Sequence, residues 1–175
     1  MRKQFGFILA LLTLLAVGLP VKGAQSTQSA SDTFTWVSEL VSVDTAARTI
    51  TVKSRIAYQE ALAELKQFKA GEPVWVVWSG MSYSDAVWQF RRPGAQSESA
   101  DRLVTRAELV SPDVTNQHVT LRVKVPEAAL AAIGALKPGE WVTVTSRRHP
   151  ASDADAIVGV KPYTESSTPT PTSTK

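Results

Sequence analysis

Apolar and polar residues follow the same order twice along the chain. Each copy begins with two strand-like segments joined by a turn that contains an aspartate, a pattern that predicts a hairpin. Each copy ends with two further strand-like segments. The predicted strands are residues 34–43, 49–56, 73–79 and 86–91 in the first copy, and residues 103–111, 119–125, 141–147 and 156–161 in the second.

A short helix is predicted between the two strand pairs of each copy, because three apolar residues are spaced to share one helix face. Lys69 and Lys137 lie where a cation favours the C-terminus of a helix, and Gly71 and Gly139 follow as stop residues. The residues on the predicted apolar face are Leu62, Leu65 and Phe68 in the first copy, and Leu130, Ile133 and Leu136 in the second.

Four short sequence blocks also recur in the same order. The block Glu-Leu-Val-Ser at 39–42 returns at 108–111, and the block Lys-x-Gly-Glu at 69–72 returns at 137–140. With the blocks in the second and last strands, the offsets between copies are 69, 71, 68 and 70 residues. Such nearly constant spacing indicates an internal repeat whose length differences lie in loops.

Each copy is too small to bury a flat sheet well, because it has about 60 residues with four or five short strands and one helix. We therefore predict a mainly β protein built from two small β-barrels in tandem, each with one short helix. The predicted parts are a signal peptide at 1–24, a polar leader at 25–33, the first barrel at 34–93, a linker at 94–101, the second barrel at 102–163 and a disordered Ser/Thr/Pro tail at 164–175.

This order of strands and helix, with Lys-x-Gly-Glu before a Val-x-Val strand, resembles the small OB-like or SH3-like barrels of exported bacterial proteins. It is more distantly similar to periplasmic copper-chaperone barrels, in which a similar step from glycine to an acidic residue precedes a strand. The resemblance covers most of residues 34–162. It implies a barrel with a binding role, and it carries no catalytic residue onto this chain.

The first 24 residues have the pattern of a secretory signal. Arg2 and Lys3 precede an apolar run of fifteen residues that ends before Pro20. A retained membrane anchor is the alternative, but the run is shorter than the roughly 20 residues that a spanning helix needs. We expect cleavage after Gly23 or Ala24, no transmembrane anchor after cleavage, and a periplasmic or secreted protein.

Cleavage changes the charge of the protein. The removed segment contains three of the 19 basic residues and none of the 16 acidic residues. The mature chain therefore carries 16 basic and 16 acidic residues. DNA and RNA binding draws its affinity from clustered Lys and Arg that neutralise phosphates. A chain without net positive charge is therefore not expected to bind nucleic acid.

Catalytic and metal chemistry find little support in the sequence. The chain has no cysteine, and Met81, His118 and His149 are scattered, so we predict neither a metal site nor a cofactor. No Gly-x-Ser-x-Gly motif surrounds a serine, and we predict no catalytic residue and no enzyme. The repeated Glu39 and Glu108 are expected to form a salt bridge within each hairpin.

The five tryptophans are informative because none has a tryptophan at the matching position of the other copy. If the repeated valines of strand 73–79 face the core, Trp75 and Val77 point outward, where the second copy has threonines. We predict a contact patch of Trp75 and Val77, with Tyr83 beside it. The alternative is that Trp75 packs against the second barrel or a loop. Trp88 is expected in the core.

Basic residues on the second strand of each copy form a candidate anion strip. They alternate with apolar residues and so share an outward face, and the alternative is an ordinary solvated face. The members of the strip are Lys53, Arg55, Arg122 and Lys124.

Taken together, these features predict a non-enzymatic, exported binding module that acts on an envelope protein or glycan through its first copy. The alternatives are a copper-type metal-binding barrel and a module that binds anions or polysaccharides.

Overall fold

The protein is mainly β in the computed structural model, which describes residues 32–79, 84–94 and 103–164. The predicted signal peptide and most of the predicted leader, linker and tail lie outside the described residues. Two short helices, α1 (Gln59–Leu65) and α2 (Glu127–Ile133), and a 3₁₀ turn, η2 (Asp153–Asp155), join the strands. The strands are β1 (Thr33–Asp44), β2 (Thr49–Ile56), β3 (Pro73–Trp78), β4 (Ala86–Arg91), β5 (Leu103–Asp113), β6 (His118–Lys124), β7 (Trp141–Arg147) and β8 (Ile157–Pro162).

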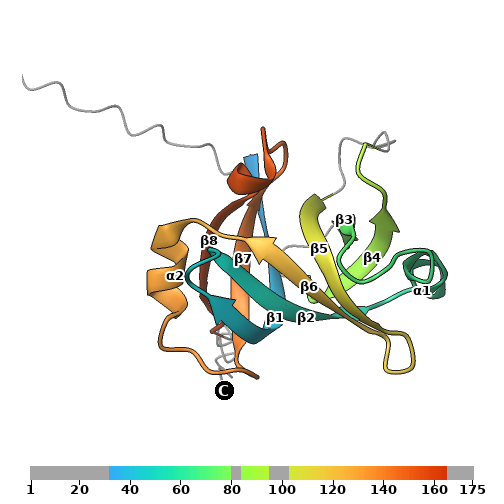
Figure 1. The fold of residues 1–175 in the computed structure, drawn as a ribbon, viewed down its shortest axis with the longest axis horizontal. Helices are drawn as coiled ribbons and strands as arrows, with labels where there is room; N and C mark the ends of the chain where they lie inside the picture. Colours follow the sequence, from blue (N-terminus) through green and yellow to red (C-terminus); the bar gives the residue numbers. More distant parts are fainter. Residues whose placement is uncertain (1–31, 80–83, 95–102, 165–175) are drawn as a thin grey trace, which may run out of the picture.

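The strands form one sheet in which the two copies exchange partners. The order is β4-β3-β5-β6-β2-β1-β7-β8, so that β1 of the first copy lies against β7 of the second, and β5 lies against β3 (Figure 1). The pairing therefore does not give the two separate barrels in tandem that were predicted. The first strand of each copy divides its pairing between the two copies. Residues 33–39 of β1 pair with β7 and residues 39–44 pair with β2, and β5 divides in the same way at Glu108. A register shift follows Leu40 or Leu109 within each hairpin.

A local two-fold axis relates the copies and passes through the β2–β6 pair. Val52 lies opposite Leu121, and the hairpin pairings place these two residues at matching positions of their copies. Two hydrogen bonds repeat across the axis, from the N–H of Ile56 to the carbonyl of Gln117 (2.7 Å) and from Val125 to Arg48 (3.0 Å). The hairpins match at an offset of 69 residues, so the offset of 71 assigned to the second strand from sequence was wrong by two.

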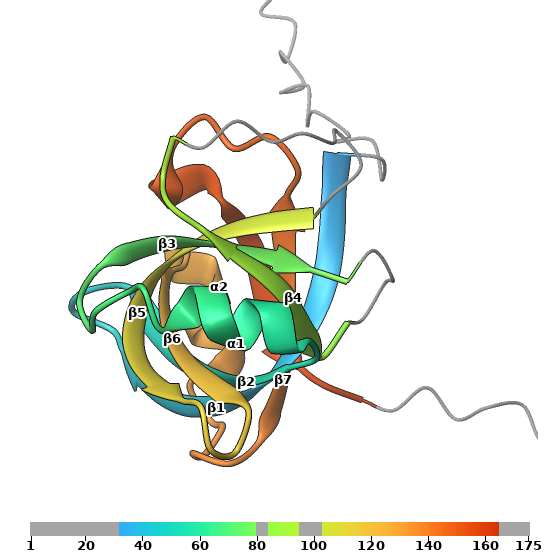
Figure 2. The ribbon, with the colours of Figure 1, turned by 90° about the vertical axis from the view of Figure 1, so that its right-hand side faces the viewer.

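The two ends of the sheet differ in how they close. At one end β4 also pairs in parallel with β2, through Ala86 opposite Arg55 and Val87 opposite Ile56. This pairing completes a closed circuit through β4, β3, β5, β6 and β2, beside which α1 lies (Figure 2). At the other end α2 packs against β8, and within the described residues β8 pairs with β7 alone.

One hydrophobic core runs through both copies. Leu62 and Leu65 of α1 and Leu130 and Ile133 of α2 are buried in it, as their spacing predicts. Burial of these apolar faces holds the short helices in place, since helices of two turns are not stable alone.

A pair of stacked tryptophans joins the copies at the centre of this core. The rings of Trp36 and Trp78 lie 4.3 Å apart, and both side chains are almost fully buried. The indole N–H of Trp36 donates to the hydroxyl of Ser146 (2.8 Å), and that of Trp78 donates to Thr105 (2.9 Å). Both rings come from the first copy and both hydroxyls from the second, where they occupy the matching positions. Each buried indole thus finds a partner across the repeat.

The last strand of each copy contains a second bulge that overturns one prediction. The register shifts so that Trp88 is the extra residue of β4 and Val158 the extra residue of β8. Phe90 is buried as expected, whereas Trp88 is 39% exposed and lies against Tyr58. Trp88 was expected in the core because strict alternation was assumed, and a bulge turns one residue away from it.

Candidate functional site

The patch predicted on strand β3 is not an open surface. Val77 is fully buried, although it is not part of the core cluster that contains its neighbours Val76 and Trp78. Trp75 is half-buried, and the guanidinium of Arg106 lies 5.5 Å from the centre of its ring. Tyr83 lies outside the described residues. The expected exposure of Val77 was therefore wrong, and Trp75 is partly covered by a side chain of the second copy.

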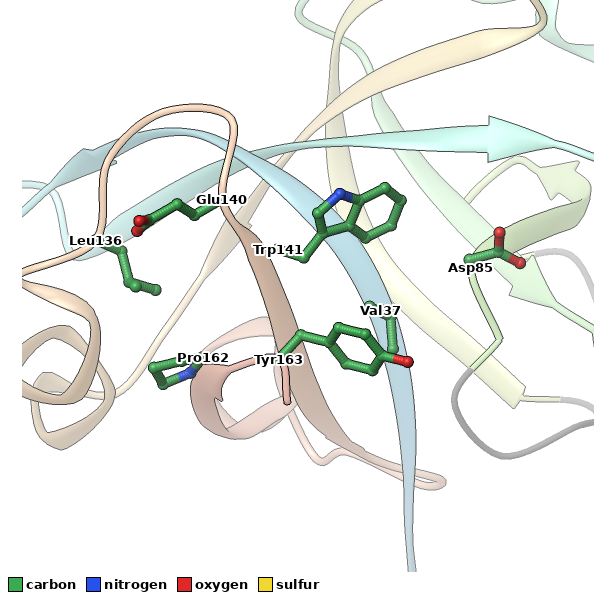
Figure 3. Close-up of a pocket in the computed structure, with 7 residues that line it drawn as sticks. All are labelled: Val37, Asp85, Leu136, Glu140, Trp141, Pro162 and Tyr163. Atoms are coloured by element: carbon green, nitrogen blue, oxygen red, sulfur yellow. The ribbon is translucent and has the colours of Figure 1, made fainter. Parts of the chain in front are cut away.

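An aromatic hollow lies elsewhere, at the junction between the start of β7 and the end of β8 (Figure 3). It has a volume of about 750 Å³ and takes side chains from both copies. The residues that line this aromatic hollow are Val37, Asp85, Leu136, Glu140, Trp141, Pro162 and Tyr163.

Two large aromatic side chains form the middle of the hollow. Trp141 is 44% exposed and Tyr163 is 37% exposed, and both rings extend past Val37 toward the side of Asp85 in Figure 3. The backbone fixes their spacing, since the N–H of Tyr163 donates to the carbonyl of Trp141 (2.9 Å). The buried Val37 belongs to β1, which pairs with β7 beside them. The rings are therefore held by the sheet and still present apolar area to solvent.

A carboxylate stands at each end of the hollow. Glu140 is held by a turn in which Gly139 has a φ of 94°, a conformation that suits glycine. Its carboxylate accepts the backbone N–H of Lys137 at 2.9 Å, and it forms no ion pair within the described residues. Asp85, at the other end, pairs with Arg55 at 3.3 Å. The negative charge of Asp85 is therefore offset by Arg55, whereas no cation among the described residues pairs with Glu140.

The first copy has a different arrangement at the matching place. There Arg92 lies over the ring of Phe68, 5.0 Å from its centre, with one guanidinium nitrogen 3.9 Å from Glu72. The guanidinium also donates to the carbonyl of Gln67 (3.0 Å). Glu72 accepts the backbone N–H of Lys69 at 3.1 Å, as Glu140 does from Lys137. The first copy therefore fills with its own arginine the place that the second copy leaves open.

The candidate anion strip lies on one face of the central β2–β6 pair, as alternation predicts. Three of its four members are paired with carboxylates: Lys53 with Glu39, Arg55 with Asp85, and Arg122 with Glu108. Lys124 has no ion pair within the described part of the chain, and it lines a hollow of about 220 Å³ beside Arg106. The strip exists as a surface, but most of its charge is offset.

The repeated glutamates form the salt bridges that were expected of them. Glu39 and Lys53 are 2.6 Å apart, and Glu108 and Arg122 are 2.8 Å apart. Each pair joins the two strands of its hairpin at matching positions. The prediction of a salt bridge within each hairpin is confirmed.

The residues considered for metal binding do not meet in the described structure. His118 lies on β6 opposite Arg55, His149 is exposed in the segment after β7, and Met81 lies outside the described residues. In the ranges that the structure covers, no three His, Cys, Asp or Glu side chains gather where they could hold an ion. Among the described residues, no helix is long and apolar enough to cross a membrane.

Trp141 and Tyr163 were missed at the level of the sequence, although a signal was present. Trp141 stands where the first copy has Pro73, which the sequence comparison shows. The position of Tyr163, which matches that of Pro93 in the first copy, follows only from the strand pairings. Trp141 was therefore the signal that the sequence carried for this site.

Comparison of the chain with protein-family models, with curated proteins and with solved structures gives no significant match.

Proposed function

We propose that this chain is an exported, non-enzymatic binding module for an envelope protein or glycan, and that its ligand contacts the aromatic hollow. The carrying observation is the pair of exposed rings, Trp141 and Tyr163, over a concave surface of about 750 Å³. Concave sites lined by aromatic side chains with a few polar groups are typical of ligand binding. Tryptophan and tyrosine are also the residues that most often dominate contact energies.

The hollow replaces the predicted patch as the proposed contact site. Val77 is buried and Trp75 is shielded by Arg106, so neither offers the open apolar area that the hollow offers. In fold terms, we infer that the copies are OB-like or SH3-like units that have exchanged their first strands. The closed circuit of pairings through β4, β3, β5, β6 and β2, which combines strands of both copies, supports that description.

The test is a crosslinking capture from the envelope fraction with three forms of the mature protein: native, Trp141→Ser and Trp88→Ser. Trp88 is the matched control because it is also an exposed tryptophan, 39% against 44%, and does not line the hollow. We expect the native chain and the Trp88 variant to capture the same ligand and the Trp141 variant to lose it. Equal capture by all three forms, or loss with both variants, would contradict the proposal.

Export is tested separately by the N-terminus of the protein isolated from cells. A mature chain that begins at Ala24 or Gln25 and is recovered outside the cytoplasm is the expected result. A chain that retains Met1 in the cytoplasm would contradict the proposed location.

A further inference from the structure

The first copy contains an internal model for what the aromatic hollow binds. Its own Arg92 lies between an aromatic ring and a carboxylate, and it donates to a backbone carbonyl. The strand pairings and the repeated Lys-x-Gly-Glu turn place Pro162 at the position of Arg92, and Glu140 at the position of Glu72. The second copy therefore keeps the carboxylate and lacks both the cation and the ring beneath it, because Leu136 stands at the position of Phe68. Trp141 and Tyr163 bring aromatic rings to the hollow from other positions.

The acceptor is built in the same way in both copies. The N–H of Gly71 donates to Leu109 (2.7 Å) and that of Gly139 donates to Leu40 (2.8 Å), so each turn is tied to the first strand of the other copy. In each turn the glutamate then accepts a backbone N–H three residues earlier. Glu140 is thus a positioned carboxylate at the edge of an aromatic hollow, without a described cation.

From this correspondence we propose that the hollow binds an arginine side chain of a partner protein, with the guanidinium at Glu140 and neighbouring partner groups over Trp141 and Tyr163. The inference rests on the proposed function and names the ligand class for the same site. Charge complementarity carries it, because Glu140 lines the hollow and has no ion pair within the described residues, whereas Asp85 at the other end is offset by Arg55.

Arginine fits better than lysine for a geometric reason. Arg92 makes two kinds of contact at once, an ion pair with Glu72 and a hydrogen bond to the carbonyl of Gln67. A planar guanidinium has donors in fixed directions for such a set, whereas an ammonium is a compact point charge. The exposed rings beside Glu140 add faces on which a guanidinium can stack.

The experiment measures binding by isothermal titration calorimetry on the mature chain, with N-acetyl-arginine amide and its neutral isostere N-acetyl-citrulline amide as probes. We expect the arginine probe to bind at least about two- to fivefold more tightly, as a single exposed cation–π or ion-pair contact provides. Glu140→Gln keeps the size and acceptor of the side chain and should remove this preference. Equal binding of the two probes, no binding of either, or a preference that survives Glu140→Gln would overturn the inference.

Two exchanges between copies sharpen the test. Pro162→Arg supplies the missing arginine within the chain and should weaken binding of the arginine probe. Arg92→Ala empties the matching place in the first copy and should add a second, weaker site for the probe. If Pro162→Arg leaves the affinity unchanged, the correspondence between the two places is wrong.

Two further measurements distinguish an arginine of a partner from other possible ligands of the hollow. The chain's own tail contains Lys175, and truncation after Thr164 should leave the preference for arginine unchanged. A tighter site in the truncated chain would make the tail the occupant and overturn the proposal. In the capture assay, loss with Trp141→Ser but not with Glu140→Gln would overturn the arginine inference and leave the proposed function standing. If the Trp141→Ser and Glu140→Gln variants both still capture the ligand, the proposed function itself is contradicted.

Discussion

In the first copy, Arg92 covers Phe68 and faces Glu72, whereas in the second copy Pro162 stands in its place and the turn glutamate, Glu140, faces an aromatic hollow. The frames beneath these two places are nearly the same. Hairpin salt bridges, bulges and glycine turns all occur at matching positions. The two copies therefore share the same backbone frame and differ in the residues at the ends of their strands. A functional site is best sought at the positions where the two copies differ.

The largest expected effect comes from separating the copies. Because β1 pairs with β7 as well as with β2, and β5 pairs with β3 as well as with β6, residues 25–93 and residues 103–175 each lack one of the two partners of their own first strand. We expect each half alone to lack a native sheet and a mixture of the two to regain it, as measured by amide NMR spectra. Halves that fold separately, with β1 against β3, would show that the copies are independent.

The central tryptophan stack is the next most sensitive point. Trp36→Thr gives the first copy the residue that the second copy has at this place, Thr105, and removes a fully buried ring. Urea unfolding should show a loss of about 3–5 kcal/mol in the free energy of unfolding, as for other large-to-small core substitutions. Trp88→Thr is the control, because Trp88 is exposed and should cost less than about 1.5 kcal/mol. Similar losses for the two variants would contradict the assignment of Trp36 to the shared core.

A buried polar pair that only the first copy has should give a smaller effect. The hydroxyls of Ser38 and Ser54 are 2.6 Å apart in the interior, where the second copy has Ala107 and Val123. Ser54→Val leaves the hydroxyl of Ser38 without this partner and should cost about 1–3 kcal/mol. The double variant Ser38→Ala with Ser54→Val copies the second half and should recover part of that loss in the same unfolding assay. A double variant that is less stable than Ser54→Val alone would contradict this explanation.

The smallest effect concerns the two hairpin turns. The side-chain amide of Asn116 and then its backbone N–H lower the pKa of Asp113 below its usual 3.8, whereas the turn of Asp44 has Ala47 at that place. A lowered folded pKa stabilises the fold above the unfolded value, and this stabilisation is lost as pH falls through the folded value. Asn116→Ala should raise the pKa of Asp113, measured by NMR titration of its carboxyl carbon. An unchanged pKa would contradict the assigned cause.

Much of the local structure follows from the sequence, but the pairing between copies does not. Alternation and helix spacing located the strands and the faces of Leu62 and Leu130, and the repeated Glu39 and Glu108 predicted the hairpin salt bridges. The first strands of the two copies are nearly alike, however, so sequence pattern alone does not tell β3 which of them to choose. In the structure β3 pairs with β5 of the other copy, and β1 pairs with β7.

The candidate site was harder to predict for a related reason. Strict alternation placed Trp88 inside, and the register shift that makes it the extra residue of β4 leaves it exposed. Val77 was expected to be exposed, yet it is buried although β3 keeps an unbroken register with β5. The hollow also combines Val37 with Trp141, residues that only the exchange of strands brings together. Trp141 was visible as a departure from the repeat, because the first copy has Pro73 at its place, and this is the signal that the sequence does carry for this site.

The most direct test of the comparison uses the five tryptophans as reporters of position. With nitrogen-15 in the indole rings alone, four signals belong to the first copy and one, from Trp141, to the second. Titration of the mature chain with N-acetyl-arginine amide should shift the Trp141 signal and leave those of Trp75 and Trp88 in place. A shift at Trp75 or Trp88 with Trp141 unchanged would return the binding site to the first copy and contradict the account.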